Sequence, residues 1–344
     1  GPNGSLPPTG WRDQAGGAAW SRLGDRDSTE WYLHLAGPGL PDVDWADPEV
    51  WAETEKALRA WCDRGVDGLW IEGAHQLCPR PVFDEDPRAD ERGSLAEPDD
   101  PRVDGPGVHE AHRTIRAVLD HYPGRIAAAD VEVADPERFA RYGRPDELHL
   151  AVQQGLRHCR FDAEQIRAVV DASLRATRAA GAVPAWTLCR PGDARAATRL
   201  GGADRARAMA LLLLALPGTA VLDAGEELCL PGWGTVVPGI AREPFAWDAA
   251  ETQLEDPGSA LSLYRHALEL RRRHPGFTAV AGEDQLEWFG APDGCLAFRR
   301  AGSTLVCALN TSAEPVPLPP GELLITSRSA PADTLPAYSA AWLA

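Results

Sequence analysis

Acidic side chains stand at the ends of three short apolar runs of the sequence. Glu72 closes the first run, Asp130 and Glu132 close the second, and Asp193 follows the third. A glycosidase needs two carboxylates that face one another across a sugar, one as acid and the other as nucleophile or base. Glu72, Asp130, Glu132 and Asp193 are therefore the candidate catalytic carboxylates, and spacing alone does not choose a pair among them. The same residue types also suit helix caps and solvated loops, and spacing alone leaves that alternative open.

Three other residues beside these carboxylates are candidate substrate contacts, namely Trp70, His75 and Arg190. Two of them also have a purely structural interpretation. His75 fits a structural hydrogen-bond partner, and Trp70 fits a core residue, because aromatic side chains favour strands. Cys189 has no visible histidine partner, which favours an inert buried thiol over a nucleophile.

The candidate residues lie in a regular alternation of short apolar strands and helices. Asp47, Pro48 and Glu49 form a helix start with Pro at the first helical position, and Gly65 ends that helix. Such alternation argues for parallel βαβ units, in either a closed barrel or a doubly wound sheet. A closed barrel of this kind uses eight strands, and five are visible. We expect strands at 66–71, 125–133, 148–152, 183–189 and 219–223, and helices at 47–65, 108–122, 162–180 and 203–216.

The two ends of the sequence lack this alternation. Residues 1–44 are expected to form a loop-rich lead-in, because they hold Gly, Pro and Trp with little periodicity. Residues 45–275 form the α/β part, whose last helix is capped by Asp256 and Pro257 and runs to about residue 274. Residues 276–344 are expected to form a small all-β sandwich domain, because short strands follow one another there without helices. Those strands are expected at 286–289, 295–300, 305–310 and 323–326.

Composition excludes several other functions. The chain has 34 Lys or Arg against 51 Asp or Glu, a net charge of -17, so it lacks the basic face that nucleic acid requires. No apolar run approaches the ~18 residues of a membrane span and no secretory signal is visible, so no membrane partner is expected. Seven cysteines are an odd number without metal-ligand spacing. They predict reduced thiols in a cytoplasmic protein, with neither a metal nor a cofactor.

Segments that carry a family resemblance run nearly end to end in a fixed order. They are Pro7-Pro8-Thr9-Gly10-Trp11, Gly16-Gly17-Ala18-Ala19-Trp20, Tyr32-Leu33-His34-Leu35, Pro41-Asp42-Val43-Asp44-Trp45, Gly65-Val66-Asp67-Gly68, Pro217-Gly218-Thr219, Gly225-Glu226-Glu227, Arg242-Glu243-Pro244-Phe245-Ala246-Trp247-Asp248, Ala297-Phe298-Arg299-Arg300 and Ala308-Leu309-Asn310. The sequence resembles glycoside hydrolase family 13, the α-amylase family, and within it the α-glucosidase and oligo-1,6-glucosidase branch. The resemblance implies a partial TIM (β/α)8-type barrel without its first three strands, followed by the C-terminal β-domain. It also implies an α-linked oligosaccharide or glucoside as ligand.

The resemblance also shows changed residues where the family keeps its catalytic groups. Glu72 stands in place of the family's nucleophilic Asp, and Trp70 in place of the Arg that supports it. Asp130 stands in place of the acid Glu. Gly192 replaces the Asp that stabilises the transition state, and Asp193 lies one residue later.

These changes predict that glycoside hydrolysis is lost or strongly reduced. Displacing a reacting group by ~1 Å can cost about 10²-fold in rate, and the missing Arg and third carboxylate remove charge stabilisation. Two alternatives stay open: an active retaining α-glycosidase or transglycosidase that uses Glu72 and Asp130, and a non-enzymatic sugar-binding or scaffold subunit. Five strands would leave two open edges, which predicts a longer native chain, or a partner chain or oligomer that covers the edges.

Overall fold

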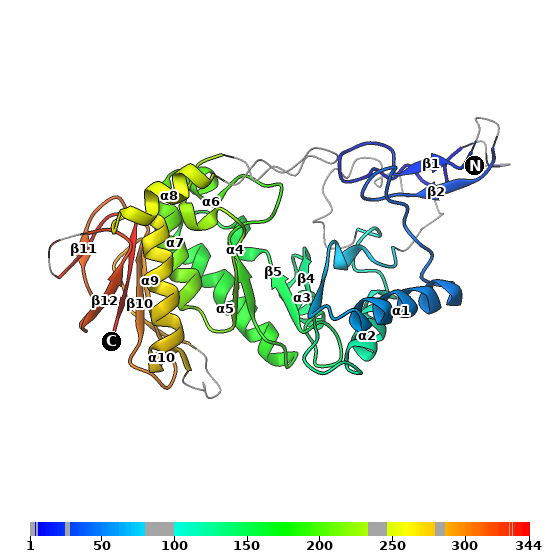
Figure 1. Cartoon of the computed structure of the whole chain (residues 1–344). Coiled ribbons are helices and arrows are strands. Elements are labelled where there is room, and N and C mark those ends of the chain that lie inside the picture. The colour runs from blue at the N-terminus through cyan, green and yellow to red at the C-terminus, as the bar shows by residue number, and fades with distance from the viewer. Residues whose placement is uncertain are drawn as a thin grey trace. The chain divides into compact units, whose positions relative to one another are not determined.

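The computed structural model describes residue 4 and residues 6–24, 28–79, 100–232, 246–278, 286–329, 331 and 333–344 (Figure 1). The chain divides into two compact units. The first unit comprises Gly1–Ala151 with Ala176–Val183, and the second comprises Val152–Arg175 with Pro184–Ala344. The domain boundaries expected near residues 44 and 275 do not coincide with this division and stay a prediction. The family segment at 242–248 lies mostly outside the described residues.

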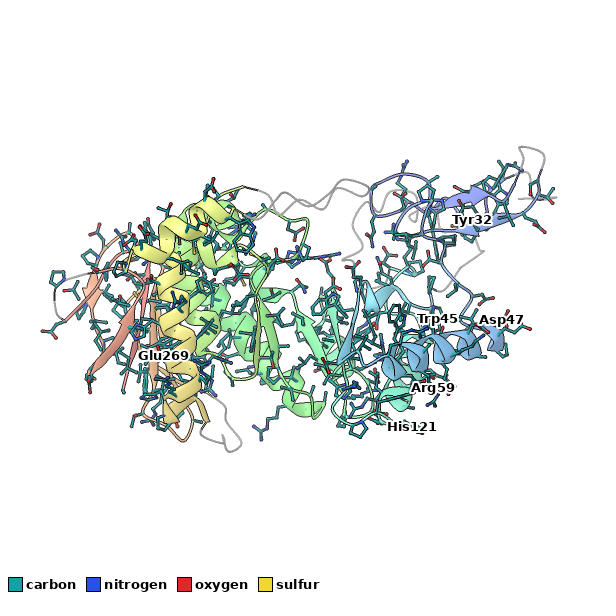
Figure 2. All side chains as sticks on the ribbon, in the orientation of Figure 1. Tyr32, Trp45, Asp47, Arg59, His121 and Glu269 are labelled. Carbon is teal, nitrogen blue, oxygen red and sulfur yellow. The ribbon has the colours of Figure 1, made fainter. Side chains whose placement is uncertain are left out.

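The first long helix, α1 (Pro48–Asp63), begins and ends as predicted. The Asp47 carboxylate accepts a hydrogen bond from Glu49 N at 2.9 Å, and Pro48 takes the first helical position. This cap satisfies a backbone N–H that the helix leaves unpaired. Gly65 follows the helix with a φ of +93°, a left-handed conformation that glycine adopts without steric cost. Figure 2 shows Asp47 at the start of α1.

A parallel strand pair forms the centre of the first unit. β3 (Gly68–Ile71) pairs with β4 (Ile126–Val131), and α2 (Val108–Leu119) packs on one face of the pair. Because successive strand residues point to opposite faces, Trp70 and Asp130 lie on the face turned away from α2. The core on the α2 face includes Leu69, Ile71, Val108, Ile115, Leu119, Ala127, Ala129 and Val131.

The described strands of the α/β part form a parallel sheet in the order β3-β4-β5-β6-β7, which confirms the five predicted strands. The residues of β5 are divided between the two units. Among the described residues β3 and β7 are the edge strands, and the sheet does not close into a barrel. The remaining elements of this part are β5 (Leu150–Gln153), β6 (Ala185–Thr187), β7 (Thr219–Val221), α3 (Pro136–Arg141), α4 (Gly155–His158), α5 (Ala163–Ala179), α6 (Ala196–Leu200) and α7 (Ala203–Ala215).

An antiparallel sheet in the order β12-β14-β10-β9-β8 confirms the predicted all-β region of the second unit. One face packs on α7 and α9 (Ala260–Arg273), where Trp342 is fully buried and its Nε1 donates to Leu211 O at 3.0 Å. The other face meets a short strand pair. These strands are β8 (Leu286–Phe289), β9 (Cys295–Arg300), β10 (Val306–Asn310), β12 (Leu323–Thr326), β14 (Ser339–Leu343), and the pair β11 (Val316–Pro317) with β13 (Thr334–Leu335).

Two segments differ from the sequence-based expectations. The lead-in holds an antiparallel hairpin of β1 (Trp20–Arg22) and β2 (Trp31–Leu33), whose three-residue strands are too short for a period-two pattern to indicate them. The cap expected at Asp256 is also wrong. Ser259 caps α9, because its Oγ accepts from Ser262 N at 3.1 Å. Asp256 instead ends α8 (Trp247–Glu255) and accepts from Gly258 N at 2.8 Å, as Asp commonly does in a turn.

Candidate active site

The register of β3 and β4 brings the two predicted catalytic carboxylates to the same level. Ile71 pairs with Ala129, so Glu72 and Asp130 are the next residues along two adjacent parallel strands. Neighbouring strands lie about 4.8 Å apart. Asp130 is 8% exposed, whereas Glu72 is exposed to solvent. Both residues therefore lie at the carboxyl ends of the strands, where barrel enzymes place their reactive groups.

A tight turn after Glu72 contacts Asp130 directly. Gly73 has a φ of +61°, and its N–H donates to Asp130 Oδ1 at 3.4 Å, just before the 3-10 turn η2 (Ala74–Gln76). A Cβ at position 73 would lie 2.9 Å from Gln76 Oε1. Glycine adopts this backbone conformation without steric cost, whereas a Cβ here would displace the Gln76 amide.

His75 is buried within η2 and contacts the end of β4. Its Nδ1 accepts the backbone N–H of Glu132 at 3.3 Å, and its carbonyl oxygen accepts Asp104 N at 2.6 Å. These contacts support the interpretation of His75 as a structural hydrogen-bond partner. Its contact with a substrate stays a prediction. Glu132 is half-buried just beyond β4, and its role as a substitute acid also stays a prediction.

Trp70 is 49% exposed, so its interpretation as a core residue is wrong. β4 is the one neighbour of β3 among the described strands, and Trp70 lies on the face that α2 does not cover. A strand side chain is buried only where a neighbouring strand or layer covers it, and strand propensity does not report that. An exposed indole has an apolar body and a polar N–H. This surface is compatible with the predicted substrate contact.

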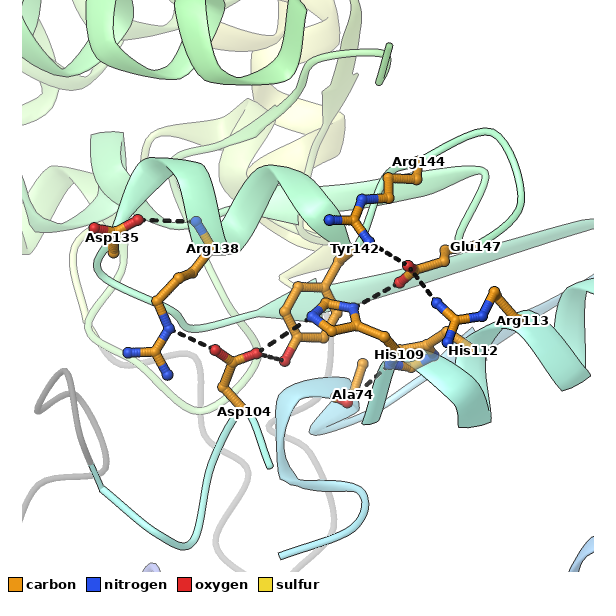
Figure 3. A network of polar contacts seen from close by, with 10 residues as sticks. All are labelled: Ala74, Asp104, His109, His112, Arg113, Asp135, Arg138, Tyr142, Arg144 and Glu147. Carbon is orange, nitrogen blue, oxygen red and sulfur yellow. Dashed lines mark hydrogen bonds and ion pairs between the residues drawn. The ribbon is translucent and has the colours of Figure 1, made fainter. Parts of the chain in front are cut away.

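A buried polar network holds the turn from the side of α2 and α3 (Figure 3). Asp104 has a φ of +51°, and its carboxylate accepts hydrogen bonds from Tyr142 Oη at 2.7 Å and Arg138 Nε at 2.6 Å. His109 Nε2 lies 3.8 Å from the same carboxylate, and His109 Nδ1 lies 2.8 Å from Glu147 Oε2. The side chains of Asp104 and Glu147 are 7% and 0% exposed, so each buried charge has the partners that it needs.

His112 connects this network to the turn. Its Nε2 donates to the carbonyl oxygen of Ala74 at 3.0 Å, and the residue is fully buried. Burial lowers the pKa of His112 to about 4, because the charged ring would lose its hydration, so the ring is neutral at pH 7. The hydrogen bonds of the network join residues 34 to 38 positions apart. Sequence analysis missed them because no local pattern reports such contacts.

In the second unit, Asp193 forms an ion pair with the guanidinium of Arg157. Arg157 is 8% exposed, and its Nε also donates to Gln154 Oε1 at 2.9 Å. Asp193 N donates to Arg190 O at 3.2 Å, which places both predicted residues in one turn after β6. Asp193 thus has a structural partner 36 residues away that the sequence did not indicate. The roles of Asp193 as third carboxylate and Arg190 as substrate contact stay predictions.

A second buried carboxyl group lies beside Cys189. Glu226 begins the turn η4 (Glu226–Leu228), and its carboxyl group contacts the Tyr264 hydroxyl at 3.2 Å and the Cys189 thiol. Burial raises the pKa of Glu226 to about 7, because its surroundings disfavour the carboxylate. Burial also raises the pKa of Cys189, which keeps the thiol protonated and agrees with the expected inert cysteine.

No three His, Cys, Asp or Glu side chains in the described ranges are arranged to hold a metal ion. All seven cysteines are free thiols. The helices of the same ranges include none that is long and apolar enough to cross a membrane.

Comparison with known protein families and curated proteins gives several matches. The family model described as "Alpha amylase, catalytic domain" matches residues 1–253. Trehalose-6-phosphate hydrolase of Escherichia coli is 30% identical over 156 residues, which are 45% of this chain and 27% of that protein. The α-glucosidase of Apis mellifera is 25% identical over 273 residues, 71% of this chain and 47% of that protein. The chain thus spans less than half the length of these relatives.

Solved structures share the fold. Isomaltulose synthase from Klebsiella sp. LX3 has a TM-score of 0.79 at 18% identity, and the match covers 98% of this chain and 75% of that one. The α-glucosyl transfer enzyme XgtA has a TM-score of 0.77 at 22% identity, with the same coverage of 98% and 75%. At these identities the likeness shows the fold alone.

Proposed function

The chain belongs to the α-amylase family, glycoside hydrolase family 13, and from this premise we propose that it binds α-glucosides with glycoside hydrolase activity lost or strongly reduced. The names of its relatives, α-glucosidase and trehalose-6-phosphate hydrolase, support an α-linked glucoside as the class of ligand. The proposed binding region is the carboxyl end of β3 and β4, with Glu72, Asp130 and the exposed indole of Trp70.

The surroundings of Glu72 are the observation that supports this proposal. Its carboxylate is exposed and makes no hydrogen bond or ion pair with any described residue. A nucleophile works only when supporting contacts hold it within about 0.5 Å of its productive position. Trp70, which stands where the resemblance places a supporting Arg, has no charge to supply. Asp193 is bound to Arg157, so it also has a role that does not require a substrate.

We expect no Glu72-dependent hydrolysis of an aryl α-glucoside. The kcat/KM values of the wild type and Glu72→Gln should agree within about twofold, because a nucleophile without support contributes little to transition-state stabilisation. Glu53→Gln is the matched control, since Glu53 is a surface residue of α1 with a side chain that is 72% exposed. Calorimetry with maltose and isomaltose should detect sugar binding to the wild type. Turnover that Glu72→Gln abolishes and Glu53→Gln preserves would contradict the proposal.

The strand register favours a second candidate, an active retaining α-glycosidase. Retaining enzymes place their two carboxyl groups about 5–5.5 Å apart. Glu72 and Asp130 directly follow Ile71 and Ala129, which are paired on adjacent strands. The backbones of such strands lie about 4.8 Å apart. In this mechanism Glu72 attacks the anomeric carbon, Asp130 protonates the departing oxygen, and water then hydrolyses the glycosyl-Glu72 ester.

This second candidate makes a distinct prediction. A trapping sugar analogue should add one glycosyl group to the peptide that contains Glu72, as measured by mass spectrometry of the digested protein. Glu72→Gln should abolish the adduct, and Asp130→Asn should slow its formation by about 10²-fold, because general acid catalysis is lost. An unmodified Glu72 peptide after prolonged incubation would leave this candidate without support.

The edges of the sheet also bear on function. β3 pairs with β4 alone and β7 with β6 alone, among the described strands. Unpaired edge strands invite association with other chains. We therefore extend the proposal to a further polypeptide segment, from a longer form of this chain or from a partner, that pairs with these edges.

A further inference from the structure

We infer that Gln76 is a sugar-contact residue whose side-chain N–H donates a hydrogen bond to a hydroxyl group of the bound α-glucoside. The inference rests on the proposed function and identifies a residue that recognises the ligand. Neither the family resemblance nor the strand-end pattern indicates this position.

The Gln76 amide lies next to Gly73, whose backbone N–H contacts the candidate carboxylate Asp130. Gln76 follows Glu72 by four residues and ends the turn η2. Its Oε1 is 2.9 Å from the position that a Cβ on Gly73 would occupy. The N–H of the same Gly73 donates to Asp130 Oδ1. The amide therefore borders the contact between the turn and Asp130.

The oxygen of the Gln76 amide has a hydrogen-bond partner among the described residues, whereas its nitrogen has none. Gln76 is 8% exposed, and its Oε1 accepts a hydrogen bond from Gln14 Nε2 at 2.7 Å. Its Nε2 is buried and has no hydrogen-bond partner among the residues that the structure describes. The structure assigns Oε1 to the end of the amide that faces Gln14, which leaves Nε2 in need of another acceptor. Buried donors in folded proteins are nearly always paired, and a ligand is one source of the missing partner.

The turn that bears Gln76 is held rigidly. Gln76 N donates to Gly73 O at 2.7 Å, which closes the turn. On the opposite side His112 donates to Ala74 O (Figure 3). Asp104 N donates to His75 O. A donor that is fixed before binding loses little conformational freedom when the ligand arrives. The turn is thus suited to recognise one particular ligand atom.

The chemistry of the amide selects the class of ligand atom. A neutral N–H donor pairs well with a neutral oxygen acceptor, such as a sugar hydroxyl. Gln14, whose backbone N–H donates to Leu35 O at 2.9 Å, adds a second neutral amide. The carboxylate of Asp130, which Gly73 N–H contacts, disfavours an anionic group nearby, because like charges repel. A hydroxyl of an α-glucoside fits all of these conditions.

The experiment compares Gln76→Met with the wild type, using methyl α-glucoside and its monodeoxy analogues as probes in calorimetry. Methionine has nearly the shape of glutamine and lacks its donor. Affinity for the parent glucoside should fall about 2- to 10-fold, the effect of one neutral hydrogen bond. One deoxy analogue should bind both proteins equally, because it lacks the hydroxyl that Gln76 contacts.

Two further variants keep the test decisive. Gln14→Met removes the partner of Oε1 but retains the Gln76 donor, so it should preserve the preference for the parent over that deoxy analogue. Gln76→Asn withdraws the donor by one methylene and serves if Gln76→Met does not fold. Unchanged affinities, or equal losses for every probe, would overturn the inference and leave water as the partner of Nε2. A folded wild type that binds no glucoside would instead overturn the proposed function.

Discussion

Replacing Glu226 by glutamine is expected to stabilise the second unit by about 3 kcal/mol more at pH 8 than at pH 4. Burial raises the pKa of this carboxyl group from 4.5 to about 7 in the folded protein. The stability that the protonated group contributes is fully present below pH 4.5 and is lost as the pH rises through 7. Above that range the folded state holds a buried carboxylate, which glutamine replaces with a neutral amide.

Urea denaturation at pH 4, 6 and 8 measures this effect, with hydrogen exchange of α7 peptides as the reporter of the second unit. Peptides of α2 report the first unit and should show no difference between the proteins. Glu227→Gln is the matched control, because Glu227 shares the turn but is only half-buried. A difference between Glu226→Gln and the wild type that is the same at all three pH values would show that Glu226 ionises as an exposed carboxyl group does.

Replacing Asp104 by alanine is expected to destabilise the first unit by about 3–5 kcal/mol. The change removes the carboxylate that Tyr142 and Arg138 both contact, while the Tyr142 side chain remains fully buried. Alanine would also have to adopt the φ of +51° found at this position. The measurement is the free energy of unfolding from urea denaturation, followed by hydrogen exchange of α2 peptides.

Two control variants separate the contribution of the Asp104 side chain to stability from that of its backbone conformation. Asp104→Gly removes the carboxylate but relieves the left-handed backbone, so it should exceed Asp104→Ala in stability by about 1–2 kcal/mol. Asp104→Asn tolerates the left-handed conformation and retains one acceptor oxygen, so it should be the most stable of the three. An Asp104→Ala variant as stable as the wild type would mean that the network in Figure 3 contributes nothing to the unit.

The helices and strands that the sequence predicted are those whose own residues carry the signal for them. The five parallel strands and their principal helices follow from short apolar runs, capping residues and glycine stops, as at Asp47 and Gly65. The sequence analysis did not predict the strand β14, and the reason is physical. All five of its residues are buried, because the strand lies between β12 and β10 and is covered on both faces. A strand buried on both faces lacks the alternation that reveals half-exposed strands.

The candidate site was predictable only in part. The residues Glu72 and Asp130 directly follow paired residues of two adjacent parallel strands, and their catalytic roles stay predictions. The exposure of Trp70 depends on how many neighbours β3 has, which the residue type does not encode. The pairing of Asp193 with Arg157 and the network around Asp104 depend on tertiary contacts between residues more than 30 positions apart. Only the folded chain reveals these.

The position of β14 has a consequence for how the protein is made. Trp342 packs on α7 through a contact with Leu211, and 131 residues separate the two in sequence. At translation rates of about 5–20 residues per second, a ribosome needs on the order of ten seconds to synthesise that interval. Throughout this time the nascent α7 lacks the strand that completes its core, although nine of its residues are destined for burial. We therefore expect α7 to expose apolar side chains until β14 has been synthesised.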